Sequence, residues 1–370
     1  MQSFIIDTFL SEYWQKKPVV LKGFFTEFVD PIDENDLAGL AQESEIDSRV
    51  ISRKNNKWQV ETGPIADFEK ACQGQWTLLV QGVDKYIADV QPLLSPFSFI
   101  PHWRLDDLMV SFATQGAGVG AHIDQYDVFL IQGKGSRRWR VGEPADYAEV
   151  LPHPKLRQIE GFSPIIDEVL MPGDVLYVPP GWPHDGMTIE DSLTYSVGYR
   201  APDNLQLAES LAMMLDKGFA NHRFSDPGRL AASSPAAVAS SDVKALKQQL
   251  IDAIQSDHFT QALLEAMSEQ GIPEFPLEQE VTIEQVSNDL ASGIGFQPAP
   301  GVRALLCDGK DGLPYALYVN GSRFDIGEND AEWYRLLASG ANFNASSCQD
   351  APSFAFLQTL ATLINNGYWE

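Results

Sequence analysis

Two segments, each combining a short apolar strand with a turn rich in glycine or proline, constrain the fold of this chain most strongly. Residues 120–127 contain His122 and Asp124, and residues 172–184 run through an apolar stretch and a Pro-Pro-Gly turn to His184. Because His122 and Asp124 are two positions apart, their side chains leave the same face of a strand. The apolar stretch and the turn would return His184 to the same end of a barrel. The sequence therefore predicts a β-barrel with these three side chains at its mouth.

Two imidazoles and one carboxylate form a specific set of metal ligands. Bound to one face of a metal, they leave three coordination positions open, as in non-haem Fe(II) oxygenases. A His-x-Asp pair alone is weak evidence in a chain with six histidines. The glycine-rich turn before the pair and the strand-turn that ends at the third ligand favour a metal site over two hydrogen-bonded core histidines. The remaining histidines lack such neighbours and are interpreted as ordinary: His102, His153, His222 and His258.

A basic strand is expected at residues 133–141, shortly after the first two ligands. Alternation places Arg137 on one face with Trp139, and Arg138 and Arg140 on the other. A guanidinium inside a barrel can bind a carboxylate through two hydrogen bonds, as a dicarboxylate cosubstrate would require. The alternative, solvated arginines on an edge strand, suits Arg138 or Arg140 better than the whole set.

The chain divides into three zones by its sequence texture. The first 200 or so residues contain short β-type runs bounded by Gly, Pro or Asp, typical of a barrel or sandwich. The clearest of these runs are residues 108–113, 128–131, 175–178 and 193–197, and Pro18 marks the change from a first helix to extended chain. From about 204 to 268 apolar residues recur at helical spacing, with Ser234 and Pro235 expected to begin a second helix.

The last hundred residues have a mixed pattern. Strands are expected at 302–307 and 315–319, joined by a turn-rich loop at 308–312, with an Asn-Gly turn after the second strand. Helices are expected around 331–337 and 354–365, the second capped by Ser353. These elements suggest a winged-helix-like unit.

Composition limits the partners and the cellular compartment. With 26 Lys+Arg against 51 Asp+Glu, the formal net charge is -25, which repels nucleic acid and anionic membranes and attracts basic partners. Solubility explains such a charge equally well. The three cysteines, Cys72, Cys307 and Cys348, are far apart in the sequence and show no Cys-x-x-Cys spacing, which argues against a disulfide framework and a thiolate zinc site. No apolar stretch is long enough to span a membrane and no signal peptide is evident, so we expect a cytoplasmic protein.

These residues resemble the JmjC-type 2-oxoglutarate oxygenases, and most closely the bacterial ribosomal oxygenases. The motifs that carry the resemblance lie in residues 9–18, 106–109, 122–129 and 179–184. The resemblance implies a mainly β fold with helices. Its parts are a double-stranded β-helix (jelly-roll, cupin-like, JmjC) catalytic domain at 1–203, a helical dimerisation region at 204–268 and a winged-helix-like domain at 269–370.

The resemblance also implies a site. Fe(II) would be held by His122, Asp124 and His184, with 2-oxoglutarate and O2 as cosubstrates. The basic residue that binds the far carboxylate of 2-oxoglutarate in relatives corresponds to Arg137, and a small hydroxylated residue on the final barrel strand corresponds to Ser196. The metal ligands would therefore also be the catalytic residues.

The resemblance implies an activity as well: 3-hydroxylation of an arginine in a large-subunit (50S) ribosomal protein, by a cytoplasmic homodimer. An acidic surface fits such a basic substrate. Three alternatives remain open: a cupin-like metal-binding isomerase or small-molecule sensor, an oxygenase acting on another protein residue or as a demethylase, and a transcription regulator. In residues 251–370 acidic side chains far outnumber basic ones. We therefore expect no direct DNA binding.

Overall fold

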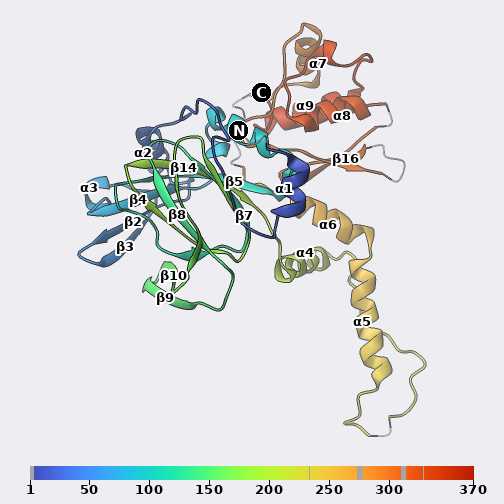
Figure 1. Ribbon diagram of the computed structural model, residues 1–370. Coiled ribbons are helices and arrows are strands. Elements are labelled where there is room, and N and C mark those ends of the chain that lie inside the picture. The colour runs from blue at the N-terminus through green and yellow to red at the C-terminus, as the bar shows by residue number, and fades with distance from the viewer. Residues whose placement is uncertain (1–3, 233, 273–276, 278, 310–313, 328) are drawn as a thin grey trace. The chain divides into compact units, whose positions relative to one another are not determined.

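The computed structural model describes residues 4–232, 234–272, 277, 279–309, 314–327 and 329–370. The chain forms two compact units (Figure 1). Unit 1 extends to Ala201 and also includes Ala299–Gly301, whereas unit 2 comprises Pro202–Pro298 and Val302–Glu370. Among the described residues, no helix is both long enough and apolar enough to cross a membrane.

Unit 1 is built around two antiparallel sheets, with strand orders β1-β12-β7-β14-β5-β4-β2-β3 and β11-β8-β13-β6. From β5 to β14 the chain passes repeatedly from one sheet to the other, which is the winding of a jelly roll. The expected double-stranded β-helix is therefore present. The larger sheet contains β1 (Val19–Leu21), β2 (Ser48–Lys54), β3 (Lys57–Thr62), β4 (Gln75–Val80), β5 (Leu105–Ala113), β7 (Asp127–Gln132), β12 (Val175–Val178) and β14 (Ser192–Tyr199). The smaller sheet contains β6 (His122–Ile123), β8 (Arg137–Gly142), β11 (Pro164–Leu170) and β13 (Pro183–Thr188), and a separate hairpin contains β9 (Ala148–His153) and β10 (Leu156–Glu160).

Alternation along the central strands separates two hydrophobic cores. On β7, Val128 and Leu130 pack with Trp139 of β8 in the core between the sheets. Phe129 and Ile131 point the other way, into the core on the outer face of the larger sheet. Since both faces are covered, β7 is buried along its whole length. This explains why it reads in the sequence as an uninterrupted apolar run rather than as an alternating one.

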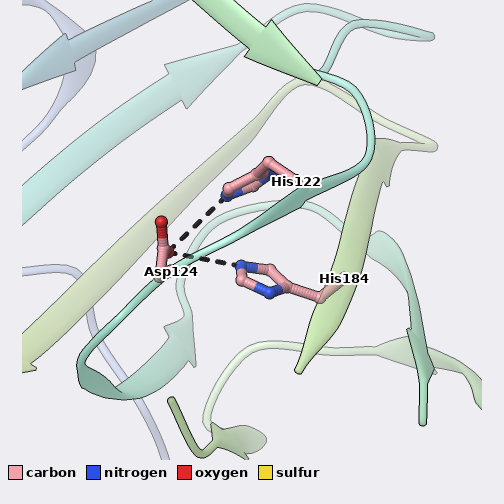
Figure 2. A group of neighbouring side chains, drawn as sticks. All are labelled: His122, Asp124 and His184. Carbon is pink, nitrogen blue, oxygen red and sulfur yellow. Dashed lines mark ion pairs between the residues drawn. The ribbon is translucent and has the colours of Figure 1, made fainter. Parts of the chain in front are cut away.

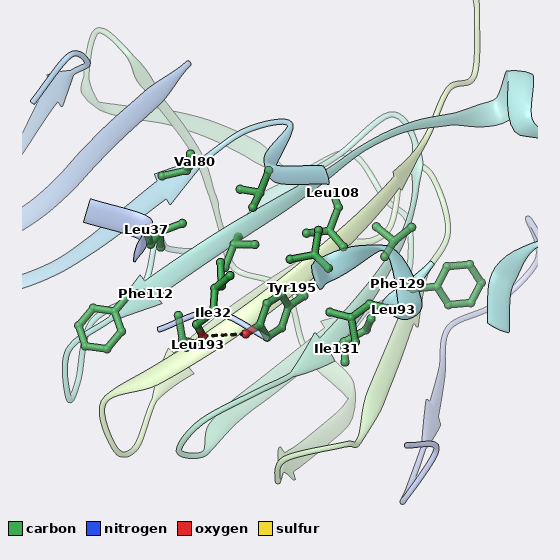
Figure 3. Close-up of a cluster of buried hydrophobic side chains, with 14 of the residues drawn as sticks. Ile32, Leu37, Val80, Leu93, Leu108, Phe112, Phe129, Ile131, Leu193 and Tyr195 are labelled. Atoms are coloured by element: carbon green, nitrogen blue, oxygen red, sulfur yellow. Dashed lines mark hydrogen bonds between the residues drawn. The ribbon is translucent and has the colours of Figure 1, made fainter. Parts of the chain in front are cut away.

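Short helices cover the outer core of the larger sheet, and Phe9 and Leu37 belong to this core. Figure 3 shows Leu37 among the other side chains of the core. The change expected at Pro18 is confirmed, because the first helix ends before it and the first strand follows directly. Asp33 caps the second helix by accepting hydrogen bonds from the backbone N–H groups of Asn35 and Asp36. The helices of unit 1 are α1 (Ile6–Glu12), α2 (Glu34–Leu40), α3 (Phe68–Ala71), η1 (Val83–Lys85), η2 (Ala88–Leu93), η3 (Ser95–Phe97) and η4 (His102–Arg104).

The late segment Ala299–Gly301 is part of unit 1 although it lies about a hundred residues after the end of the barrel. At Gly301, where φ is +76°, the backbone runs very close to η1. A Cβ there would lie 2.8 Å from the Cα of Lys85, so only glycine fits. The segment therefore braces the turn that contains Lys85.

Unit 2 begins with the helices α4 (Asn204–Asp216), α5 (Ser240–Ile254) and α6 (Asp257–Ser268). The helical texture expected here is confirmed, but the start expected for the second helix is wrong. Ser234 forms a local turn, its hydroxyl accepting from the backbone N–H of Ala236, and Pro235 lies within that turn. The helix begins at Ser240. The Ser-Pro pair gives a turn instead of a helix start because apolar helical periodicity begins only after it.

The last part of unit 2 contains both strands and helices, as expected from the sequence. Strands β15 (Leu305–Asp308), β16 (Pro314–Val319) and β17 (Ser322–Asp325) form one sheet, with α7 (Ile283–Ala291), α8 (Ala331–Ser339), η5 (Ala345–Ser347) and α9 (Phe354–Asn365). The first strand begins three residues later than expected, and most of the loop after it lies outside the described residues. Asn320 and Gly321, with φ of 44° and 83°, form the expected hairpin turn. Ser353 caps α9, as expected, by accepting from the N–H of Phe356.

Candidate active site

The structure brings together the three side chains that the sequence singles out as metal ligands. One ligand atom from each of His122, Asp124 and His184 lies within 4.8 Å of the others (Figure 2). The Nε2 atoms of the two histidines lie 3.7 Å and 3.5 Å from a carboxylate oxygen of Asp124. Bonds from such ligands to zinc are about 2.0–2.2 Å long, so two ligand atoms on one ion are about 3–4 Å apart. The observed spacing suits a single divalent ion.

Strand register produces this convergence. In the β6–β13 pair, His122 lies directly opposite His184. β6 ends at Ile123, so Asp124 follows the strand instead of lying in it. Its backbone carbonyl accepts a hydrogen bond from the N–H of Gly181, which holds the turn before β13 next to the segment that contains Asp124.

The hydrogen bonds of both histidines leave the correct nitrogen free. Nδ1 of His122 lies 2.9 Å from the carbonyl oxygen of Gly120, and Nδ1 of His184 lies 3.0 Å from that of Trp182. Since a carbonyl can only accept, each Nδ1 carries the proton and each Nε2 keeps its lone pair. Burial, together with the nearby His122, lowers the pKa of His184 below its usual range. His184 is therefore neutral at neutral pH, as a metal ligand must be.

This donor set matches a first-row metal with open coordination positions. Two neutral imidazoles and one carboxylate are the ligands of non-haem Fe(II) sites. The three side chains line a cavity of about 600 Å³, which leaves room for further ligands on the metal. The residues present therefore fit Fe(II).

Arg137 lies in the same cavity, on β8. Its side chain is buried, stacks 4.7 Å above the ring of Trp139, and donates to the carbonyl of Gly186 at 3.1 Å and to the hydroxyl of Thr194 at 3.4 Å. Burial lowers the pKa of Arg137 to about 10, so the guanidinium is still cationic at neutral pH.

Within the part of the chain that the structure describes, the charge of Arg137 has no ion-pair partner. Its Nε has no hydrogen-bond acceptor, and none of the described carboxylates forms an ion pair with it. A buried cation without a counter-ion is costly, and an anionic ligand would relieve that cost. The cavity thus offers a place for the far carboxylate of a dicarboxylate next to a metal site.

The hydroxyl group that meets Arg137 belongs to Thr194, which sequence reasoning missed. Ser196, the residue expected to assist, lines the same cavity from the same face of β14 but forms no described hydrogen bond with Arg137. Alternation puts both hydroxyls on one face, and that signal was available in the sequence. Which of the two hydroxyls meets Arg137 depends on the position of β14 relative to β8, which lies in the other sheet.

A second, acidic cavity of about 350 Å³ adjoins the first. The two share a wall made of Gln81, Met109, Tyr126, Val128 and Ser196. In the second cavity lies Asp107, on β5, another residue to which sequence reasoning gave no role.

The carboxyl of Asp107 is held in place and partly desolvated. One oxygen accepts from the N–H of Gly82 at 2.7 Å. Burial, followed by the charges of Asp84 and Asp106, raises the pKa of Asp107 to about 6. At neutral pH the group is mostly ionised. Lys85 also lines this cavity, but the carboxylates of Asp106 and Asp107 outnumber it, so a further cation would stabilise Asp107. The second cavity therefore suits a basic side chain.

Comparisons with known proteins agree with this geometry. The JmjC domain family matches residues 92–207, and the ROXA-like winged helix family matches residues 245–370. The ribosomal protein uL16 3-hydroxylase of Escherichia coli (strain K12) is 41% identical over 368 residues, which is 98% of this chain and 96% of that protein. A probable ribosomal oxygenase of Haemophilus influenzae is 31% identical over 375 residues, covering 96% and 89% of the two chains.

A solved structure is similar over the full length. YcfD, a ribosomal oxygenase from Escherichia coli in complex with cobalt and 2-oxoglutarate, matches with a TM-score of 0.90 and 38% identity, covering 100% of this chain and 98% of that one. The similarity therefore extends beyond the barrel and covers both units.

Proposed function

We propose that this chain, which belongs to the JmjC family of ribosomal oxygenases, 3-hydroxylates an arginine of a basic large-subunit ribosomal protein. It is an Fe(II)- and 2-oxoglutarate-dependent dioxygenase. The relatives named for this activity support the choice of substrate. The observation that carries the proposal is the presence of two adjoining cavities. One contains the metal ligands and the cation of Arg137, the other is acidic, and the two share a wall.

In this proposal His122, Asp124 and His184 hold Fe(II), each through the atom that faces the other two. Iron with 2-oxoglutarate and O2 supplies the oxidising power to hydroxylate an unactivated C–H bond, while 2-oxoglutarate is converted to succinate and CO2. Burial keeps His184 neutral, and the carbonyl partners of the two Nδ1 atoms orient both rings so that each Nε2 faces Asp124. The protein thereby presents two lone pairs and one negative charge.

Arg137 binds the far carboxylate of 2-oxoglutarate, with Thr194 beside it and Ser196 as a further hydroxyl on the same wall. The guanidinium is already fixed by Trp139 and by the carbonyl of Gly186, so little side-chain entropy is lost on binding. Burial of the site excludes water from the carboxylate–guanidinium pair, which strengthens it.

Asp107 binds the guanidinium of the target arginine. A long basic side chain can place its charged end in the acidic cavity while an earlier carbon lies in the metal-bearing cavity, because the two share a wall. Holding the reacting carbon in position accounts for a large part of the rate that such an enzyme achieves. Tyr126 and Met109, on the shared wall, would contact the aliphatic part of the side chain.

We further propose that the protein is a cytoplasmic homodimer joined through residues 204–268, with a catalytic domain at 1–203 and a winged-helix-like domain at 269–370. Support for the dimer comes from α5, where apolar side chains recur on one face and are each between 42% and 52% exposed. These side chains are Val243, Leu246, Leu250, Ile251 and Ile254. The acidic composition of residues 251–370 supports contact with protein and not with DNA.

Mass spectrometry of isolated large-subunit ribosomal proteins tests the proposed activity. We expect the chain, supplied with Fe(II), 2-oxoglutarate and O2, to add one oxygen atom to an arginine of one of these proteins. His122→Ala and Asp124→Ala should abolish both the oxygen gain and succinate formation. Oxygen on a different residue type, loss of a methyl group, or turnover that survives in either variant would contradict the proposal.

A further inference from the structure

We propose that Gly186 is a positioning residue for the cosubstrate: its missing side chain leaves the space in which the guanidinium of Arg137 is held. This inference rests on the proposed function, because it concerns the group that would bind 2-oxoglutarate. Gly186 lies on β13, two residues after His184 and directly opposite Trp139 of β8. It is therefore next to both the proposed metal ligand and the proposed anion-binding residue.

The backbone at Gly186 does not itself require glycine. Its φ lies outside the positive range that other residues avoid, unlike that of Gly181 in the preceding turn. Any residue could adopt this extended strand conformation. The reason for glycine must be space.

The space in question is taken up by the arginine and the tryptophan. A Cβ at Gly186 would lie 2.6 Å from Nε of Arg137 and 2.7 Å from both Cη2 and Cζ3 of Trp139. These distances are far below van der Waals contact. A methyl group at this position must displace one or both side chains.

Neither side chain has room to yield. Arg137 and Trp139 are each 4% exposed and stack on one another. Strand β13 cannot move away either, because the segment that contains Gly118 packs against it. The carbonyl oxygen of Gly186 lies 2.3 Å from where a Cβ of Gly118 would be. The same carbonyl accepts from Nη2 of Arg137. Gly186 thus both makes room for the guanidinium and helps to orient it.

A side chain at 186 would therefore move the guanidinium away from Thr194 and from the cavity that the metal ligands share. Overpacking of this kind typically costs enough to reduce binding about tenfold or more. The two histidine ligands form their own hydrogen bonds to Gly120 and Trp182, so we expect metal affinity to change much less.

Calorimetry on metal-loaded protein without oxygen tests the inference independently of turnover. Purified protein saturated with Mn(II) under nitrogen is titrated with 2-oxoglutarate. Gly186→Ala should weaken 2-oxoglutarate binding about tenfold or more, with Mn(II) affinity within about twofold of the parent. Unchanged 2-oxoglutarate affinity, or an equal loss of Mn(II) affinity, would overturn the inference.

Gly142→Ala is the matched control. Gly142 lies on the same β8 strand as Arg137, and a Cβ there would meet the ring of Phe162 at 2.6 Å, a comparable clash that is far from the guanidinium. This variant should lose stability while 2-oxoglutarate affinity remains within about twofold. If both variants lose affinity equally, strain in the sheet explains the effect and the inference is wrong.

A double variant keeps the test decisive if Gly186→Ala folds poorly. Lysine has no planar group stacked on Trp139 and can bend away from the new methyl group. The cost of Gly186→Ala, in thermal stability and in 2-oxoglutarate affinity, should therefore be smaller in an Arg137→Lys background. An equal or greater cost there, or no recovery of folding, would refute the steric explanation.

Failure of this inference can be distinguished from failure of the proposed function. If Arg137→Ala leaves 2-oxoglutarate affinity unchanged, Arg137 does not bind the cosubstrate and the proposed function loses that residue. If Arg137→Ala weakens binding and Gly186→Ala does not, only the role of Gly186 is wrong.

Discussion

Replacing Asp107 with asparagine removes one charge from the acidic cavity while keeping its shape. One carboxylate oxygen is occupied by the N–H of Gly82 at 2.7 Å. The other, Oδ1, faces Gly198, from whose added Cβ it would lie 3.7 Å away. An asparagine can keep the first hydrogen bond with its carbonyl oxygen. Its NH₂ group would then point at an incoming guanidinium, and two donors would face each other.

The expected magnitude follows from the loss of a hydrogen bond between charged groups. Such bonds contribute about 1.5–3 kcal/mol, and about 1.36 kcal/mol corresponds to a factor of ten. Asp107→Asn should therefore raise the KM for the protein substrate by about 10- to 150-fold. The KM for 2-oxoglutarate should stay within about twofold, since Arg137 and the metal ligands line the other cavity.

The assay follows hydroxylation of an arginine-containing ribosomal protein by mass spectrometry over a range of substrate concentrations. Asp106→Asn is the matched comparison, because Asp106 lines the same cavity, but its side chain is 61% exposed and already forms an ion pair with Arg200. Exposed pairs contribute about 0–1 kcal/mol, so this variant should change KM by less than about fivefold. A KM for Asp107→Asn no higher than that of Asp106→Asn would refute the assignment of the acidic cavity.

Three further outcomes are expected. Because the pKa of Asp107 is raised to about 6, lowering the pH from 7.5 to 5.5 protonates most of this carboxyl group, so the KM for a basic substrate should rise. Asp107→Asn should flatten this dependence on pH. Identical pH profiles for the parent and the variant would contradict the idea. Thr194→Ala should weaken 2-oxoglutarate binding in calorimetry more than Ser196→Ala, because the Thr194 hydroxyl meets the buried guanidinium; the reverse order would favour Ser196. Leu246→Glu with Leu250→Glu should shift the protein from dimer to monomer in sedimentation experiments, because both side chains are about half exposed on one face of α5; an unchanged sedimentation coefficient would place the interface elsewhere.

Local pattern was enough to predict the elements that build the barrel. Alternation on β8 correctly separated buried Arg137 from exposed Arg138 and Arg140, because a strand buried on one face records that face every second residue. By contrast, the Ser234–Pro235 pair carried a local signal for a helix start, but no apolar periodicity followed it directly. The chain forms a turn there.

Contacts between distant strands could not be predicted in the same way. Thr194 and Ser196 share a face, and only the stagger of β14 decides which hydroxyl reaches the guanidinium. Asp107 is held in the second cavity because β14 pairs with β5 and because Gly82, just before η1, supplies an N–H. Gly186 has an ordinary strand conformation, so no backbone signal in the sequence separates it from other glycines. These contacts can be predicted only once the order of the strands in the sheets is known.

The small return segment Ala299–Gly301 has a consequence for how the protein can be divided. Cutting the chain after the barrel would remove the backbone that packs against Lys85, which lines the acidic cavity. An isolated N-terminal fragment would then keep its metal ligands and the pocket for the keto acid but leave the η1 turn unsupported. Such a fragment should bind cofactors normally and yet recognise the ribosomal protein poorly. On the proposed role of the acidic cavity, substrate recognition would thus depend on three residues encoded far beyond the barrel.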